Sequence, residues 1–300
     1  MPIAHLALAG GGPAGLVTYG ALRELHARSF WSLGEIKSVY GTSAGAFMGL
    51  VISLGLEWNV LDNYFVKRPW DRIASVTPDM LVGSVRRKGL FGQDVAEAAL
   101  APLLEARGLT CKTTLSELYE FTGIEFVAFT TNVNTYKLES VALSHRTFPE
   151  LPVATAIAMT IAVPVLFQPV FHEGGCYIDG GCLANLPVDE CLREQACDAS
   201  EVLAIKYAWD GDADARVAPE SSLVEYLAVF VRKVQLTLSS EDDQTRVPHW
   251  LESTMVSCGG VRRWSDVLAD QGLREALVTQ GSSDAAAWHA SLEGDREKLA

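Results

Sequence analysis

The chain has 300 residues, of which 49% are hydrophobic and 20% are charged. These are the proportions of a folded globular protein, and they exclude long disorder as the main state. Thirty-seven acidic side chains against 24 Lys and Arg give a net charge of −13, which opposes general binding to the phosphate backbone of nucleic acids.

The first two thirds of the chain alternate short apolar runs with amphipathic patterns. In chain order these predict a strand over 3–9, a helix over 15–28, a strand over 36–40, a helix over 46–54, helices over 93–106 and 115–121, and strands over 125–131, 137–143 and 202–207. Strands that alternate with helices indicate an α/β fold, with a central, mostly parallel sheet flanked by helices.

The last third of the chain has a different pattern. Residues 221–239 carry apolar side chains at helical spacing, and shorter helical segments are predicted up to residue 292. We therefore expect an α/β domain over 1–210 and a helical C-terminal extension over 211–300 that packs on the same domain. The acidic residues 210–220 are expected to form an exposed loop, because Ala215 replaces the glycine that a calcium-binding loop would need.

Two stretches approach the length of a membrane span without a charged residue, 38–56 and 151–171. Glycines interrupt the first and prolines interrupt the second, so we expect both to lie in the core. The N-terminus has no Lys or Arg before its apolar run, and the six cysteines show no C-x-x-C spacing. We therefore expect no signal peptide or transmembrane helix, free thiols, and a cytoplasmic protein.

The motif Gly41-x-Ser43-x-Gly45 lies between an apolar strand and an apolar helix. A sharp strand-to-helix turn exposes its central serine, and flanking glycines avoid collisions at the bend. The N-terminus of the helix directs its free N–H groups toward the serine oxygen. The motif favours a nucleophilic serine, and the alternative is a glycine-rich turn whose serine caps the helix.

Residues 10–15, Gly-Gly-Gly-Pro-Ala-Gly, follow the first predicted strand and are compatible with two functions. As G-x-G-x-x-G, Gly10, Gly12 and Gly15 match a dinucleotide-binding fingerprint, which would indicate a flavin- or NAD-binding oxidoreductase. Alternatively, the backbone N–H groups of the loop hold a developing oxyanion. The acidic residue that should bind the ribose is absent, because the second strand ends in Tyr40, so the oxidoreductase is disfavoured.

A third element is Asp179-Gly180-Gly181, which Asn185-Leu186-Pro187 follow. An aspartate between an apolar approach and two glycines can present its carboxylate close to another backbone segment. Alone, such a sequence is most often a turn.

Together, these three elements resemble the patatin-like phospholipase family. The marks of that family are a glycine-rich oxyanion loop after the first strand, a G-x-S-x-G turn, and an aspartate in D-G-G or D-G-A. The likeness extends over about residues 3–210. It includes Gly89-Leu90-Phe91, residues 114–119, residues 131–134, Ala158 to Pro164, Phe167 to Val170, and Asn185-Leu186-Pro187.

The resemblance implies a three-layer patatin-like fold with a catalytic domain over 1–210. It also implies a lipid acyl hydrolase of the phospholipase A or lysophospholipase type, which acts on phospholipids or other lipid esters in transient contact with a membrane surface. Ser43 would be the nucleophile and Asp179 the base, with an oxyanion hole at Gly10, Gly11 and Gly12. No metal, organic cofactor or nucleic acid is implied.

Two observations leave alternatives open. Ala14 stands where the family often has Arg or Lys, so a non-catalytic lipid-binding member is an alternative. His249 and His289 follow Asp179 and are the rivals for the base, although neither lies in a motif.

Two segments are candidates for lipid contact. The helix over 221–239 could supply an apolar approach, although packing on the core is the preferred interpretation. The cluster Arg86-Arg87-Lys88 could meet anionic headgroups or be a solvated charge run.

Overall fold

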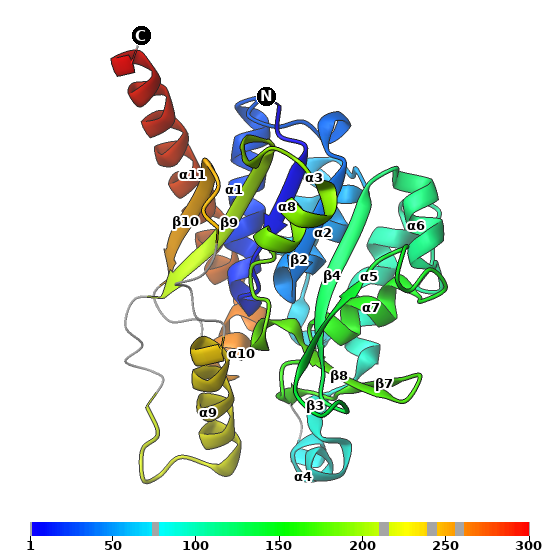
Figure 1. Ribbon diagram of the computed structural model, residues 1–300. Helices are drawn as coiled ribbons and strands as arrows, with labels where there is room; N and C mark the ends of the chain where they lie inside the picture. Colours follow the sequence, from blue (N-terminus) through cyan, green and yellow to red (C-terminus); the bar gives the residue numbers. More distant parts are fainter. Residues whose placement is uncertain (1, 74–77, 210–215, 239–244, 256–260, 300) are drawn as a thin grey trace.

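The computed structural model describes residues 2–73, 78–209, 216–238, 245–255 and 261–299. Within these ranges eight strands form one sheet in the order β10-β9-β1-β2-β4-β8-β7, with β5 paired to β4 (Figure 1). Their bounds are β1 His5–Leu8, β2 Ser38–Thr42, β4 Glu125–Asn132, β5 Glu139–Leu143, β7 Val170–His172, β8 Gly175–Asp179, β9 Val202–Trp209 and β10 His249–Met255. A smaller parallel pair joins β3 (Gly89–Phe91) to β6 (Val165–Phe167).

The sheet is mostly parallel, as the sequence predicts. β10, β9, β1, β2 and β4 run in one direction, whereas β5 and β8 pair antiparallel with β4 and β7 pairs antiparallel with β8. The parallel strands β1 and β2 are buried at every residue. Helices therefore cover both faces, which is the usual requirement of a parallel sheet.

The helices pack on this sheet from both sides. In Figure 1, α8 lies in front of the sheet on β1 and β9, and α2 lies behind β1, β2 and β4. The longer helices are α1 Gly15–Ala27, α2 Ala44–Ser53, α4 Pro78–Arg87, α5 Gln93–Glu105, α6 Leu115–Thr122, α7 Val153–Thr160, α8 Val188–Gln195, α9 Leu223–Leu238, α10 Val261–Ala269 and α11 Gln271–Leu299. Short helices are η1 Gly12–Ala14, η2 Leu33–Glu35, α3 Trp58–Asp62, η3 Asn63–Lys67, η4 Trp70–Arg72, η5 Gly180–Cys182 and η6 Ala199–Glu201. The result is three layers, helices on sheet on helices.

The two long uncharged stretches lie in the core, as predicted. Residues 38–56 form β2 and α2, and residues 151–171 contain α7, β6 and the first residues of β7. Most of their apolar side chains are buried. Among the helices of the described residues, none combines the length and the apolar character of a membrane span.

The C-terminal segment differs from the prediction in one element. We predict only helices after residue 211, yet His249–Met255 form the strand β10, parallel to β9 at the edge of the sheet. The physical reason is pairing with β9, and the side chains then alternate, since Leu251 and Ser253 are buried while Glu252 and Thr254 are exposed. Residues 216–220 of the predicted exposed loop are exposed, whereas residues 210–215 and Cys258 lie outside the described residues.

α11 packs along α1 through glycines on both helices. A Cβ added to Gly20 would lie 2.0 Å from the carbonyl oxygen of Val278, and a Cβ added to Gly281 would lie 2.0 Å from that of Val17. The two backbones therefore approach more closely than any side chain at either position would allow. The C-terminal segment packs on the same globule as the first helix.

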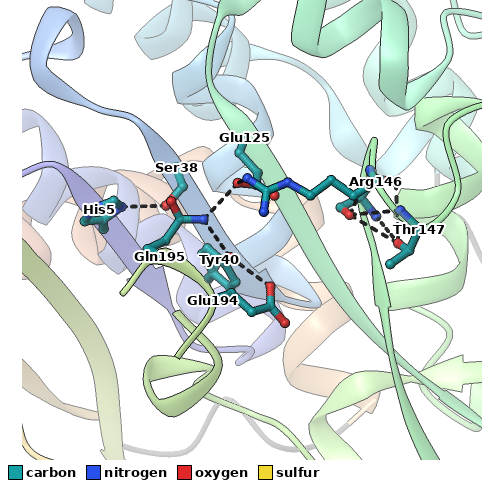
Figure 2. Close-up of polar contacts among 9 residues, drawn as sticks. His5, Ser38, Tyr40, Glu125, Arg146, Thr147, Glu194 and Gln195 are labelled. Atoms are coloured by element: carbon teal, nitrogen blue, oxygen red, sulfur yellow. Dashed lines mark hydrogen bonds and ion pairs between the residues drawn. The ribbon is translucent and has the colours of Figure 1, made fainter. Parts of the chain in front are cut away.

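A polar network ties α8 to the face of the sheet (Figure 2). Glu125 of β4 is buried and accepts hydrogen bonds from Arg146 at 2.6 Å and from the side-chain amide of Gln195 at 2.8 Å. The same amide of Gln195 donates to the hydroxyl of Tyr40 at 2.9 Å, and that hydroxyl donates to Glu194. Partnering the buried carboxylate in this way compensates its loss of hydration. The network ties the C-terminal end of α8 to β2 and β4.

Candidate active site

The sharp turn at Ser43 has the geometry of a nucleophile elbow. Ser43 has φ 53° and ψ −125°, a backbone conformation that residues other than glycine rarely adopt. A Cβ on Gly41 would lie 2.7 Å from the backbone of Ala46, and one on Gly45 would lie 2.3 Å from the carbonyl oxygen of Leu8. Glycine is therefore required on both sides of the serine.

Asp179 ends β8 at the level of the elbow. In the sheet register Thr42 pairs with Phe129, and Asp179 pairs with the next residue of β4, Thr130. Ser43 and Asp179 therefore stand at the same level on the two sides of β4. A Cβ on Gly180 would lie 2.2 Å from the carbonyl oxygen of Phe129, so the turn after Asp179 requires glycine there.

The Asp179 carboxyl group is fully enclosed. Its Oδ1 accepts a hydrogen bond of 2.7 Å from the N–H of Gly181. Burial raises the pKa of Asp179 to about 6, and the nearby Ser43 hydroxyl and the Gly181 N–H oppose this rise. The second oxygen, Oδ2, is buried, and no donor among the described residues meets it in full hydrogen-bond geometry. Hydrogen bonds of catalytic groups are often poorly aligned before substrate binds, so this geometry is compatible with a role of Asp179 as a base.

Asn185 links the loop of residues 10–15 to the Asp179 turn. The N–H of Gly10 donates to the carbonyl of Asn185 at 3.1 Å, and the side-chain amide of Asn185 donates to the carbonyl of Gly10 at 3.3 Å. The N–H of Gly10 is therefore engaged, which disagrees with the prediction that it joins the oxyanion hole. In the part of the chain that the structure describes, the N–H groups of Gly11 and Gly12 have no partner. They are the donors available for an oxyanion.

Gly15 begins α1 beside the elbow, where a Cβ would lie 3.1 Å from that of Ala44. Ala14, the departure from the family pattern, is completely buried.

Ser43 lies in the wall of an apolar cavity of about 180 Å³. α1, α2, β3, β6, η3 and α10 contribute to the lining, with Leu16, Phe47, Phe65, Phe91, Phe167 and Trp264 among the apolar side chains. A cavity of this composition suits a hydrocarbon chain, because burial of each methylene contributes about 0.8 kcal/mol.

Two residues of the C-terminal segment complete this cavity. The ring of Trp264 lies over the loop of residues 10–15, so that a Cβ on Gly12 would lie 2.3 Å from it. The guanidinium of Arg274 is buried and donates to the carbonyls of Val66, Arg68, Val267 and Leu268 at 2.8–3.2 Å. It ties α10 and α11 to the opposite wall. No local motif in the sequence marks either residue, so neither could be predicted as part of the site.

The rival histidines lie elsewhere. His249 and His289 line a separate cavity of about 560 Å³ together with Ile3, which precedes β1. Ser43 follows the other end of the parallel strands. Neither histidine is placed to act as a base for Ser43.

Comparison with known proteins decides the family. The model of patatin-like phospholipases matches residues 6–192, which is more than half of the chain. The chain belongs to the patatin-like phospholipase family.

Relatives of this patatin-like chain are distant in sequence. It is 23% identical over 190 residues to "Probable lipid hydrolase 463L" of Invertebrate iridescent virus 6, a match that covers 63% of each chain. It is 27% identical over 191 residues to the protein YqhO of Bacillus subtilis, covering 60% of this chain and 63% of that one. Each match spans less than two thirds of the relative's length.

One solved structure extends the likeness of this patatin-like chain to the fold. VipD from Legionella pneumophila matches with a TM-score of 0.50 at 15% identity, over 94% of this chain and 67% of that one. The alignment shows a shared fold that includes the C-terminal segment.

Proposed function

We propose that this protein hydrolyses acyl ester bonds in phospholipids or related lipids, through an acyl-enzyme on Ser43 with Asp179 as the base. The observation that supports the proposal best is that Ser43, in a strained conformation, and the buried carboxylate of Asp179 lie close together beside an apolar cavity. Membership of the patatin-like phospholipase family supports it.

The acylation step follows from this arrangement. Oγ of Ser43 attacks the ester carbonyl while its proton passes to Oδ2 of Asp179. The carbonyl electrons move onto oxygen, where the N–H groups of Gly11 and Gly12 stabilise the negative charge. Collapse breaks the ester bond, Asp179 returns the proton to the leaving alcohol, and the acyl chain stays on Ser43.

The deacylation step reverses these roles. Asp179 takes a proton from water, whose oxygen attacks the acyl carbonyl in the same oxyanion hole. The released fatty acid and the reprotonated Ser43 complete the cycle. These steps use only side chains and backbone groups of the chain, and they call for no metal or cofactor.

The cavity supports an acyl chain rather than a headgroup as the group bound beside Ser43. Its described lining is almost entirely apolar, and the one charged side chain there, Arg274, is occupied by four backbone carbonyls. A phosphate group would lose hydration in this cavity without a partner. The phospholipase A or lysophospholipase type of reaction is therefore our proposal.

Labelling with a fluorophosphonate, read by intact mass, tests the mechanism. We expect one adduct on the wild type and on Ser53→Ala, a control that removes another buried hydroxyl from α2. We expect none on Ser43→Ala and much slower labelling of Asp179→Asn. Hydrolysis of phosphatidylcholine, measured as released fatty acid, should fail in both site variants. Lipid binding without any adduct on the wild type would favour the non-catalytic alternative instead.

A further inference from the structure

α9 presents a stripe of large apolar side chains to solvent. Leu223, Tyr226 and Phe230 are 69%, 47% and 54% exposed. Their spacing places all three on one face of the helix. The rings of Tyr226 and Phe230 stack with centroids 6.4 Å apart. Exposed apolar side chains that gather in this way mark interaction sites more often than isolated ones do.

Another face of α9 packs on the candidate active site. The side-chain amide of Gln235 donates to Sγ of Cys182 at 3.5 Å, and α9 contacts η5, the short helix after Asp179. Gln235 lies on a different side of the helix from the apolar stripe. The helix therefore joins the Asp179 turn to the exposed stripe.

A second group of exposed side chains lies where α4 leads into β3. Val85 is 86% exposed, and Arg86 and Arg87 follow it. No carboxylate of the described residues pairs with either arginine. Nζ of Lys88 lies 5.7 Å from the ring of Phe171, which is 61% exposed on β7.

Both groups lie at one end of the molecule. In Figure 1, α4 and α9 extend from the lower end, toward which β1 and β2 run and where the Ser43 turn follows β2. We call the seven side chains together the α4–α9 surface: Val85, Arg86, Arg87, Phe171, Leu223, Tyr226 and Phe230.

We propose that the α4–α9 surface docks the protein on anionic phospholipid bilayers. The inference rests on the proposed function, and it names the surface that presents the site to aggregated substrate. Charge complementarity selects the partner, because a chain of net charge −13 is repelled by anionic headgroups except where basic residues gather. The apolar and aromatic side chains beside the arginines suit the boundary between headgroups and acyl chains.

The single acidic side chain of α9, Glu225, does not oppose this docking strongly. Glu225 accepts hydrogen bonds from the backbone N–H and hydroxyl of Ser222 at 2.8 and 3.0 Å, which caps the helix. Its charge is thereby engaged at the N-terminus of α9, where it also stabilises the helix dipole.

Co-sedimentation with vesicles tests the proposal, in the Ser43→Ala background so that no lipid is consumed. We expect binding to vesicles of equal phosphatidylcholine and phosphatidylglycerol, weaker binding at raised salt, and little binding to phosphatidylcholine alone. Arg86→Glu/Arg87→Glu should lower the partition coefficient at least about 25-fold. Leu223→Ser/Phe230→Ser should lower it roughly tenfold.

Matched controls carry the same kinds of substitution, charge reversal and removal of an apolar side chain, at exposed positions outside the α4–α9 surface. Arg107→Glu/Lys112→Glu reverses two exposed charges near α5 and α6, and Phe121→Ser removes a ring that is 44% exposed on α6. Both controls should bind vesicles as the parent does. With Ser43 restored, all variants should hydrolyse a soluble short-chain nitrophenyl ester at the parent rate.

The outcomes separate the two proposals. If the protein with Ser43 intact binds vesicles but does not hydrolyse the soluble ester, the proposed function is wrong and the docking proposal is retained. The docking proposal alone would be overturned if the active protein does not bind anionic vesicles. The same conclusion would follow if the surface variants bind these vesicles as strongly as the parent does. A dimer in solution that Phe230→Ser converts to monomer would assign the stripe to self-association instead.

Discussion

The backbone N–H of Ser43 donates a 2.8 Å hydrogen bond to Oγ1 of Thr160, which in turn donates to the carbonyl of Phe129. Thr160 ends α7 and is completely buried. One hydroxyl therefore holds the strained serine against the central strand β4. In the proposed mechanism Thr160 is a positioning residue, since it reaches the reacting atoms only through Ser43.

Thr160→Val should lower kcat at least about tenfold and leave KM within about twofold, because the serine loses its position while the acyl cavity is unchanged. It should also lower the free energy of unfolding by about 1–3 kcal/mol, since a buried N–H and a buried carbonyl lose their partner. Thr160→Ser keeps the hydroxyl and should restore kcat. An equal loss of kcat in Thr160→Val and Thr160→Ser would mean that the shape of the side chain, and not its hydrogen bond, positions Ser43.

The pH dependence of hydrolysis should report the buried base. Burial raises the pKa of Asp179 to about 6, and only its ionised form accepts the proton of Ser43. We expect kcat/KM to rise with pH and to reach half of its plateau near pH 6. Steady-state rates with a soluble nitrophenyl ester measure this. A plateau that persists down to about pH 4 would place the base elsewhere.

Asp179→Asn should make the protein more stable above pH 6. In the unfolded chain an aspartate titrates near pH 3.9, so between that value and about 6 the folded wild type binds more protons and loses stability as pH rises. The neutral amide avoids this loss, which amounts to about 3 kcal/mol at pH 8 and about 1 kcal/mol at pH 4.5. Urea unfolding at the two pH values gives the difference. An increase in the free energy of unfolding that is the same at both pH values would contradict the titration of Asp179 as its cause.

Trp264→Ala should change the preferred acyl length. Its ring lies beside Gly12 and contributes to the cavity wall, so its removal lengthens the space for hydrocarbon. In a series of nitrophenyl esters, we expect kcat/KM for the longest chains to rise at least about tenfold relative to the shortest. Trp250→Ala removes a ring of β10 outside that lining and should leave the profile unchanged.

Gly281→Ala should push α11 away from α1. The new Cβ would lie 2.0 Å from the carbonyl oxygen of Val17, and a rigid backbone oxygen cannot move aside alone. We expect a loss of about 1–3 kcal/mol in the free energy of unfolding. Gly294 lies on the same helix, and outside the helix's own backbone an added Cβ there would meet no described atom within 4 Å. Gly294→Ala should therefore be neutral or stabilise by about 0.5–1 kcal/mol. Thermal unfolding of the two variants compares them directly.

The sequence predicts the α/β core well because its signals are local. The apolar strands and the turns at Gly41 and Gly180 are recognised from neighbouring residues alone. The register then brings Ser43 and Asp179 to one level of the sheet.

The C-terminal walls of the site could not be predicted in this way. Trp264 and Arg274 act through contacts with Gly12 and Val66, more than 200 residues earlier in the chain. Similarly, β10 is fixed by pairing with β9 rather than by a strong pattern of its own. The engaged N–H of Gly10 depends on Asn185 and is equally nonlocal.

The close packing of α1 on α11 also constrains the order of events on the ribosome. Gly281 emerges about 260 residues after Gly20, which at ordinary translation rates is a delay of roughly 13 to 50 s. During that interval α1 has no contact with α11, the helix that covers it in the folded protein. α1 therefore gains its final partner, α11, only after every strand of the described sheet has been synthesised.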